Sequence, residues 1–195
     1  MTSFAILVSG RGSNMEALAE AVRDGRLDAR IDFVAADSAE APALEKARKK
    51  GIDTFVLPYA AEGKKKAEEF LSGLCSTRRV EWIVLAGFMR ILSPEFVRAH
   101  TGRIVNIHPS LLPSFPGKDG IGDAWKLGVA VTGVTIHLVD EGVDSGTILA
   151  QRPVEIHPED TFEIVEKKIH DAEHALYWKT LSELFRGALP VERRW

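Results

Sequence analysis

Two polar side chains near the middle of the chain lie within a segment that otherwise has the pattern of a buried strand. Residues 104–113 read IVNIHPSLLP, with Asn106 and His108 two residues apart before Pro109 ends the apolar run. Side chains two residues apart on a strand point to the same face. A histidine can transfer protons near neutral pH, and an asparagine amide can donate a hydrogen bond to a developing oxyanion. The pair therefore indicates acyl-transfer chemistry at a strand end.

The sequence offers no recognisable nucleophile for a covalent mechanism. It has no G-x-S-x-G motif, and its single cysteine, Cys75, stands in no catalytic context. We therefore expect the acyl group to pass directly to a bound acceptor. A carboxylate beside the imidazole would hold it protonated, and the loop VDEGVDSG provides three acids, Asp140, Glu141 and Asp144. Residue types alone do not choose among the three, and an ordinary strand end with satisfied hydrogen bonds remains an alternative for the pair.

A glycine-rich loop, SGRGSN, follows the first expected strand and precedes a helical segment. The N–H groups at the start of a helix favour a bound phosphate. Gly10 and Gly12 match the dinucleotide motif G-x-G-x-x-G, but Met15 occupies its third position. Asp37 ends the second expected strand, where such a site uses an acid for the ribose. The loop therefore allows three interpretations: a phosphate monoester site, a nicotinamide dinucleotide site, or a tight turn capped by its serine or asparagine.

The first part of the chain alternates strands and helices. Strands are expected at residues 4–8, 31–36, 54–57, 82–85 and 103–108, and helices at 15–22, 43–50, 63–77 and 94–100. This alternation predicts a parallel sheet with helices on its faces.

The last part of the chain has a different pattern. A short helix is expected at 119–128, followed by strands at 129–139 and 147–156 that are joined directly and should pair antiparallel. We expect Asp160 to cap a long helix after them. The apolar stripe of this helix is formed by Phe162, Val165, Ile169, Ala172, Leu176 and Leu184. The predicted fold is one α/β domain: a mostly parallel, Rossmann-like sheet with helices on both faces and an antiparallel C-terminal edge.

Composition excludes several classes of partner. A net charge of −3 over 195 residues gives no electrostatic case for binding nucleic acid or an anionic membrane. A single cysteine permits no internal disulfide and fits a reducing compartment. The apolar run near the N-terminus is too short for a signal peptide or a membrane span, so we expect a cytoplasmic protein. We expect it to act as a monomer or homodimer on small molecules.

Four stretches, in order along nearly the whole chain, resemble the phosphoribosylglycinamide formyltransferases of purine biosynthesis: ILVSGRGSNMEAL, VLAGFMRILSP, NIHPSLLPSFPG and HLVDEGVDSG. The resemblance implies one formyltransferase domain over residues 1–195, with a phosphate-binding half at 1–100 and a catalytic and folate-binding half at 101–195. The implied reaction moves the formyl group from N10 of 10-formyltetrahydrofolate, the co-substrate, to the glycinamide amine by direct attack. It needs no metal.

The resemblance also implies residue roles. Asn106 and His108 match the catalytic pair that stabilises the oxyanion, and Asp144 matches the carboxylate that keeps the histidine charged. Residues that match the acceptor-substrate site are Gly12, Ser13, Asn14 and Glu173. Residues that match the folate site are Met89, Arg90, Ile91 and Leu92, together with Asn106 and, in the run of three lysines at 64–66, Lys65. Some relatives have a histidine-rich stretch after SFPG; this chain has KDGIGDAW there, and no role carries over.

Three other interpretations compete with this one. His170, Glu173 and His174 fit the H-x-x-E-H metalloprotease pattern, which needs a third ligand from the short segment that remains. A different folate enzyme is a second alternative, namely a formyltetrahydrofolate hydrolase or a methionyl-tRNA formyltransferase. Both of these carry an additional domain for which the chain has no room. A non-catalytic nucleotide-binding domain that uses SGRGSN and Asp37 is the third.

Overall fold

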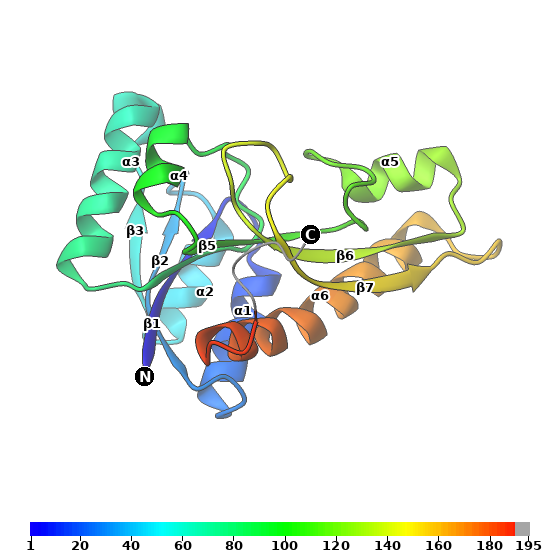
Figure 1. The fold of residues 1–195 in the computed structure, drawn as a ribbon, viewed down its shortest axis with the longest axis horizontal. Coiled ribbons are helices and arrows are strands. Elements are labelled where there is room, and N and C mark those ends of the chain that lie inside the picture. The colour runs from blue at the N-terminus through cyan, green and yellow to red at the C-terminus, as the bar shows by residue number, and fades with distance from the viewer. Residues whose placement is uncertain (190–195) are drawn as a thin grey trace.

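The computed structural model of the chain describes residues 1–189. Seven strands form a single sheet in the order β3-β2-β1-β4-β5-β6-β7 (Figure 1). The strands are β1 (Thr2–Val8), β2 (Ala29–Ala36), β3 (Asp53–Val56), β4 (Trp82–Leu85), β5 (Ile104–His108), β6 (Val131–Leu138) and β7 (Ile148–Glu155). The pairs among β1 to β5 are parallel, whereas β6 pairs antiparallel with both β5 and β7. The predicted mostly parallel sheet with an antiparallel C-terminal edge is confirmed.

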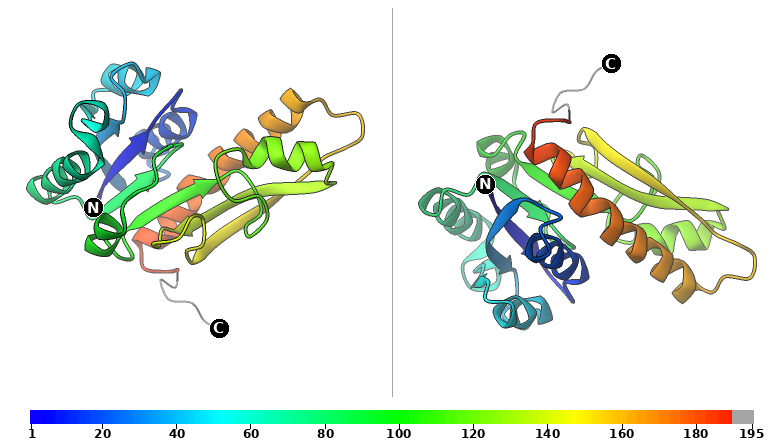
Figure 2. Two further views of the ribbon diagram at one scale, coloured as in Figure 1. Left: turned by 90° about the horizontal axis from the view of Figure 1, so that it is seen from above. Right: turned by 90° about the horizontal axis from the view of Figure 1, so that it is seen from below.

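Helices cover both faces of the sheet. On one face lie α1 (Ser13–Arg23), α2 (Pro42–Lys49) and the long α6 (Phe162–Phe185); on the other lie α3 (Tyr59–Thr77) and α4 (Pro94–Ala99). The short α5 (Gly120–Leu127) contacts the start of α6, where Trp125 and Phe162 meet edge to face. The two further views show α6 running along the antiparallel strands (Figure 2).

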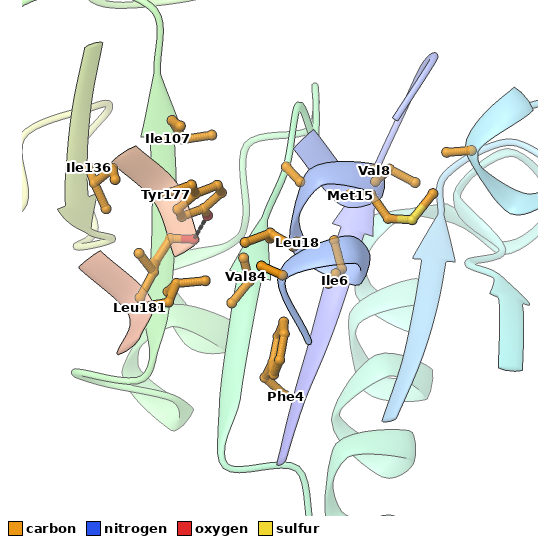
Figure 3. Close-up of a cluster of buried hydrophobic side chains, with 14 of the residues drawn as sticks. Phe4, Ile6, Val8, Met15, Leu18, Val84, Ile107, Ile136, Tyr177 and Leu181 are labelled. Carbon is orange, nitrogen blue, oxygen red and sulfur yellow. Dashed lines mark hydrogen bonds between the residues drawn. The ribbon is translucent and has the colours of Figure 1, made fainter. Parts of the chain in front are cut away.

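The larger hydrophobic core lies between the sheet and the helices α1, α2 and α6. Met15 and Leu18 of α1 and Tyr177 and Leu181 of α6 pack against strand residues there (Figure 3). The Tyr177 hydroxyl is fully buried and donates a hydrogen bond of 2.8 Å to the carbonyl oxygen of Leu85. This bond satisfies the only polar atom of that side chain, so α6 can bury a tyrosine against β4 without leaving its hydroxyl unpaired.

Alternation along β5 decides which residues face which layer. Val105 and Ile107 belong to the core beneath α6, whereas Ile104 belongs to the smaller core beneath α3 and α4. Since strand side chains alternate, Asn106 and His108 lie on the same face as Ile104. The sequence prediction that the pair shares one face is confirmed.

Some element boundaries differ from the sequence expectations. Asp160 does not cap α6: Thr161 does, with its hydroxyl accepting from the N–H of Ile164 at 3.4 Å. The Asp160 carboxylate instead accepts from the N–H of His157 at 2.8 Å and pairs with Lys168. Both residue types can cap a helix, and the preceding turn had already engaged the aspartate.

Two further expectations about the helices need adjustment. Helix α3 begins at Tyr59, before the expected residue 63, because a first helical turn is joined to the main helix across a kink at Gly63, whose backbone is non-helical with positive φ (φ 81°, ψ 174°). In the apolar stripe of α6, Phe162 and Leu176 are only partly buried, while the other four residues are buried as expected. Among the helices of residues 1–189, none has the length and apolar character needed to cross a bilayer.

Candidate active site

A cleft of about 670 Å³ opens at the carboxyl ends of the central strands. The chain runs outward from β1 to β2 and β3 on one side and from β4 to β5 on the other, so the strand order reverses between β1 and β4. Open α/β sheets bind ligands at such a point. The cleft is lined by the loop after β1 (9–14), the segment after β4 (86–92), the end of β5, His137, residues 139–144 and one side of α6. Both halves of the chain therefore contribute to it.

The structure brings Asn106, His108 and Asp144 together, although 36 residues separate the last two along the chain. The Asp144 Oδ2 atom lies 3.5 Å from His108 Nδ1, and its Oδ1 atom accepts from Asn106 Nδ2 at 3.5 Å. The other two acids of this loop point elsewhere. Asp140 accepts from Ser145 at 2.8 Å, and Glu141 pairs with Arg98 of α4 at 2.6 Å. Geometry therefore selects Asp144, which residue types alone had left undecided.

The His108 imidazole is 3% exposed, and both of its nitrogens face hydrogen-bond acceptors. Its Nε2 atom lies 2.7 Å from the carbonyl oxygen of Phe115, while Nδ1 faces the Asp144 carboxylate. A carbonyl only accepts, so Nε2 carries a hydrogen here. A neutral ring can donate from one nitrogen, whereas an imidazolium donates from both. The surroundings of His108 thus place an acceptor beside each ring nitrogen.

The Asp144 carboxyl is held as an anion by its contacts. Burial opposes its ionisation, but the contact with His137 and the 2.8 Å hydrogen bond from the Gly117 N–H outweigh that effect, with a further contribution from His108. The pKa of Asp144 therefore lies below its usual value. The residue adopts a left-handed backbone conformation (φ 52°), which aspartate tolerates better than most side chains.

His137 is a member of the cluster that the sequence analysis missed. It lies opposite Asn106 in the β5–β6 pairing, and its Nε2 is 3.2 Å from Asn106 Nδ2 and 3.6 Å from Asp144 Oδ1. Its Nδ1 donates to the carbonyl oxygen of Leu138 at 2.9 Å, which leaves Nε2 facing the cluster. The expected strand at 129–139 contained this histidine, but only the antiparallel register shows that it meets Asn106.

The glycine-rich loop ends at the N-terminus of α1. Gly12 occupies the N-cap position with φ 76°, and neither Ser13 nor Asn14 caps the helix with its side chain. A Cβ atom on Gly12 would lie 2.5 Å from the Cβ of Ala43, so the position requires glycine on both conformational and steric grounds. The first N–H groups of the helix have no partners within it, and residues 12–14 line the cleft. This end of the cleft suits an anion.

Glu173 of α6 contacts both the anion site, through Asn14, and His170 of its own helix. The carboxylate is 4% exposed, accepts from Asn14 Nδ2 at 3.1 Å and lies 2.8 Å from His170 Nδ1. The hydrogen bond with Glu173, opposed by burial, raises the pKa of His170 above its usual value. The His174 ring stacks on that of His170. In the part of the chain that the structure describes, no three histidine, cysteine or acidic side chains are grouped to hold a metal ion, so the metalloprotease interpretation gains no support.

The segment expected to line a folate site forms one wall of the cleft. Met89 and Ile91 are 52% and 61% exposed, whereas Leu92 is buried. Arg90 donates from Nε to the Asp37 carboxylate at 2.6 Å and lies over the Tyr59 ring. The acid that a dinucleotide would need for its ribose is thus engaged by an arginine.

Lys65 is the exception among the expected site residues. It is exposed on α3 and is not among the residues that line the cleft. Its contact with a bound folate stays a prediction.

Comparison with known proteins shows the family to which the chain belongs. Residues 2–181 match the family model described as formyl transferase. The chain is 40% identical to phosphoribosylglycinamide formyltransferase from Bacillus subtilis, over 94% of this chain and 95% of that protein. It is 38% identical to the human trifunctional purine biosynthetic protein adenosine-3, over 96% of this chain but 19% of that longer protein.

Solved structures of glycinamide ribonucleotide transformylases are similar to this chain over most of its length. Glycinamide ribonucleotide transformylase 1 from Symbiobacterium toebii superposes with a TM-score of 0.94 at 36% identity, covering 100% of this chain and 92% of that one. The enzyme of the same name from Geobacillus kaustophilus superposes with a TM-score of 0.91 at 43% identity, covering 94% and 98%.

Proposed function

The chain belongs to the formyl transferase family, as its sequence had suggested, and we propose that it transfers a formyl group from 10-formyltetrahydrofolate to the amine of phosphoribosylglycinamide. The observation that supports the proposal is that one cleft contains both an anion site and a cluster of polar side chains. An anion-binding helix start at residues 12–14 lies at one end, and the cluster of Asn106, His108 and Asp144 lies at the end of β5. An acceptor with a phosphate at one end and an amine at the other fits these two sites together.

The reaction is a direct transfer between two nitrogen atoms. The acceptor amine attacks the formyl carbon, forms a new C–N bond and places negative charge on the formyl oxygen. When the bond from carbon to N10 breaks, N10 gains a proton and the acceptor nitrogen loses one. No protein side chain has to become covalently attached, which agrees with the absence of a nucleophile motif from the sequence.

Donors for the oxyanion come from the two loosely held N–H groups of the cluster. The hydrogen bond from Asn106 Nδ2 to Asp144 is 3.5 Å long, at the outer limit, and the contact of His108 Nδ1 with Asp144, also 3.5 Å, is an ion-pair contact without hydrogen-bond geometry. A substrate oxygen placed beside these two groups can accept from either N–H without breaking a short hydrogen bond to Asp144. Asp144, as a carboxylate, offsets the charge of the imidazolium and accepts the proton that the amine releases, directly or through water.

The co-substrate would lie against residues 89–92. Met89 and Ile91 present apolar surface, and the backbone of this segment can pair with the polar edge of a pterin. Glu173, Ser13 and Asn14 would hold the acceptor at the opposite end. Formyl transfer of this kind uses 10-formyltetrahydrofolate as a co-substrate that leaves as tetrahydrofolate.

A release assay tests the proposal directly. Purified protein is mixed with 10-formyltetrahydrofolate, with and without phosphoribosylglycinamide, and tetrahydrofolate is measured. We expect release only when the acceptor is present. Release without the acceptor would instead show a hydrolase on the same scaffold, and no release in either mixture would contradict the proposed substrates.

A further inference from the structure

Three side chains form a row across the antiparallel edge of the sheet. His108 of β5 is registered opposite Thr135 of β6, and Thr135 is registered opposite Gln151 of β7. Residues directly opposite one another in antiparallel strands share a face and lie close together. Gln151 therefore lies on the catalytic face of the sheet, although it belongs to an exposed edge strand and does not line the cleft.

The middle residue of the row has a fully used hydroxyl. Thr135 Oγ1 donates to the carbonyl oxygen of Ser110 at 2.7 Å and accepts from the Leu112 N–H at 3.0 Å and from Gln151 Nε2 at 2.9 Å. One donation and two acceptances are all that a hydroxyl can make. Gln151 Nε2 also donates to the carbonyl oxygen of Leu112 at 2.9 Å. The Gln151 amide and the Thr135 hydroxyl together thus hold the start of the 109–117 loop on the sheet.

Packing supports this docking independently of the hydrogen bonds. A Cβ atom on Gly133 would lie 2.7 Å from the side chain of Leu111 and 2.2 Å from the carbonyl oxygen of Arg152. Residue 133 therefore has to be glycine for the loop to sit this close to β6 and β7.

The far end of the same loop touches the catalytic histidine. Ser110 Oγ donates to the carbonyl oxygen of Ser114 at 2.5 Å and lies 3.3 Å from that of Phe115. Phe115 has a left-handed backbone (φ 54°), which is uncommon for a bulky residue and is maintained by its surroundings. Its carbonyl oxygen faces His108 Nε2 at 2.7 Å. With Nε2 fixed in this way, Nδ1 is directed toward Asp144.

We propose that Gln151 is a positioning residue, which acts through Thr135 and the 109–117 loop to hold the Phe115 carbonyl against His108 Nε2. The inference rests on the proposed function, because it concerns the orientation and protonation of the histidine used in that reaction. Without the amide of Gln151, the Leu112 carbonyl loses a donor, the loop loosens, and the carbonyl that accepts from the imidazolium is displaced. The histidine then loses one of its two acceptors.

The effect of Gln151 on His108 can be measured because the charged groups around the imidazole stay the same in the variant. Asp144 faces Nδ1 from the loop after β6, and His137 of β6 and Lys118 beyond the 109–117 loop line the same cleft. Replacing Gln151 with a neutral side chain changes none of them.

The test compares Gln151→Met with Arg152→Met. Methionine retains the length of the glutamine but has no N–H, and Arg152, the next residue on β7, points to the opposite face of the sheet and is exposed. For Gln151→Met we expect kcat to fall by on the order of tenfold, with both KM values within about twofold of the original protein. The alkaline limb of the kcat profile should move to lower pH. Arg152→Met should change none of these quantities.

A spectroscopic measurement separates this proposal from the proposed function. The proton on His108 Nε2, bonded to a carbonyl in a buried site, should give a slowly exchanging imidazole N–H resonance, identified by its absence from His108→Gln. The resonance should weaken or disappear in Gln151→Met and persist in Arg152→Met, whether or not the protein transfers formyl groups. An unchanged resonance, or a pH profile that superposes on the original, would overturn the role of Gln151. A loss of thermal stability alone would show that its contacts are only structural.

Discussion

Strands β5 and β6 carry different chemistry on their two faces. One face bears Val105, Ile107, Val134 and Ile136, which pack in the core beneath α6. The other face bears Asn106, His108, Thr135 and His137, which are joined to each other or to neighbouring loops by hydrogen bonds. The backbone and the register are common to both faces. Alternation alone therefore separates residues that maintain the fold from residues that we propose carry out the reaction.

The difference between the faces arises from what covers them. The parallel strands β1 and β4 are covered by helices on both faces and are apolar on both. At the antiparallel edge, α6 covers one face, but the other is covered by the 109–117 loop, whose peptide groups need polar partners. Some polar side chains on that face, Thr135 and Gln151, bond the loop, while others, Asn106, His108 and His137, line the cleft.

Replacing the histidine should produce the largest effect. We expect His108→Ala to lower kcat by about 10²- to 10⁴-fold, the range associated with loss of a proton-transferring side chain. The fold should persist, because the apolar face is unchanged. Turnover and circular dichroism measured on the same sample check both expectations. Near-normal turnover would remove His108 from the proposed mechanism.

Truncating a side chain on the apolar face should lower the free energy of unfolding and leave kcat nearly unchanged. Ile136 is fully buried, so Ile136→Ala should lower the free energy of unfolding by about 2–5 kcal/mol. We expect kcat to stay within about twofold of the original at temperatures where the variant is folded. Urea denaturation and steady-state kinetics provide the two numbers. A large fall in kcat without loss of stability would contradict the separation of the two faces.

The proposed phosphate site at the start of α1 is formed by backbone N–H groups, so a change of its glycine tests a site that does not depend on side chains. Gly12→Ala combines an unfavourable left-handed conformation with a clash against Ala43, and should lower stability by about 1–3 kcal/mol. It should also raise the KM for phosphoribosylglycinamide more than that for the folate, because the start of α1 has to shift. Gly25→Ala is the matched control: its φ is 72°, but an added Cβ meets nothing within 4 Å. Equal KM values in the two variants would exclude the phosphate role of the loop.

The smallest effect concerns stability at acid pH. The folded-state pKa of Asp144 is lowered, so its ionisation contributes stability that is fully present above the unfolded pKa, about 3.9, and is lost as pH falls through the folded value. The original protein should therefore exceed Asp144→Asn in unfolding free energy at neutral pH, and this excess should shrink below about pH 4. Denaturation curves between pH 7 and pH 3 test the sign. An excess that grows as the pH falls would show that the carboxyl is stabilised in its neutral form.

Much of the fold follows from local patterns in the sequence. Apolar runs separated by helical periods predicted the parallel strands, and the period of two placed Asn106 and His108 on one face. The cap of α6 was predicted at the wrong residue because Asp160 and Thr161 are both good caps, and only the surrounding contacts decide between them. Asp160 is engaged by the preceding turn, through the His157 N–H, and by Lys168, so it is not available to cap the helix.

The functional cluster was only partly accessible from sequence. The place of His137 in the cluster, and that of Gln151 behind the 109–117 loop, depend on the register between β5, β6 and β7, which no local pattern determines. The engagement of Asp37 by Arg90 likewise depends on a contact between residues 53 positions apart. Resemblance supplied Asp144 and Glu173 because it carries tertiary information that periodicity lacks.

The contacts of Asp144 link proton binding to the contact between two loops. Its own loop, after β6, is tied to the 109–117 loop by the bond from the Gly117 N–H and to the sheet through His137. These contacts lower the affinity of the carboxyl for a proton. By thermodynamic reciprocity, any event that separates the loops must raise that affinity, and protonation must favour separation. Separation of the two loops would thus be accompanied by proton uptake at the carboxyl that we propose takes part in catalysis.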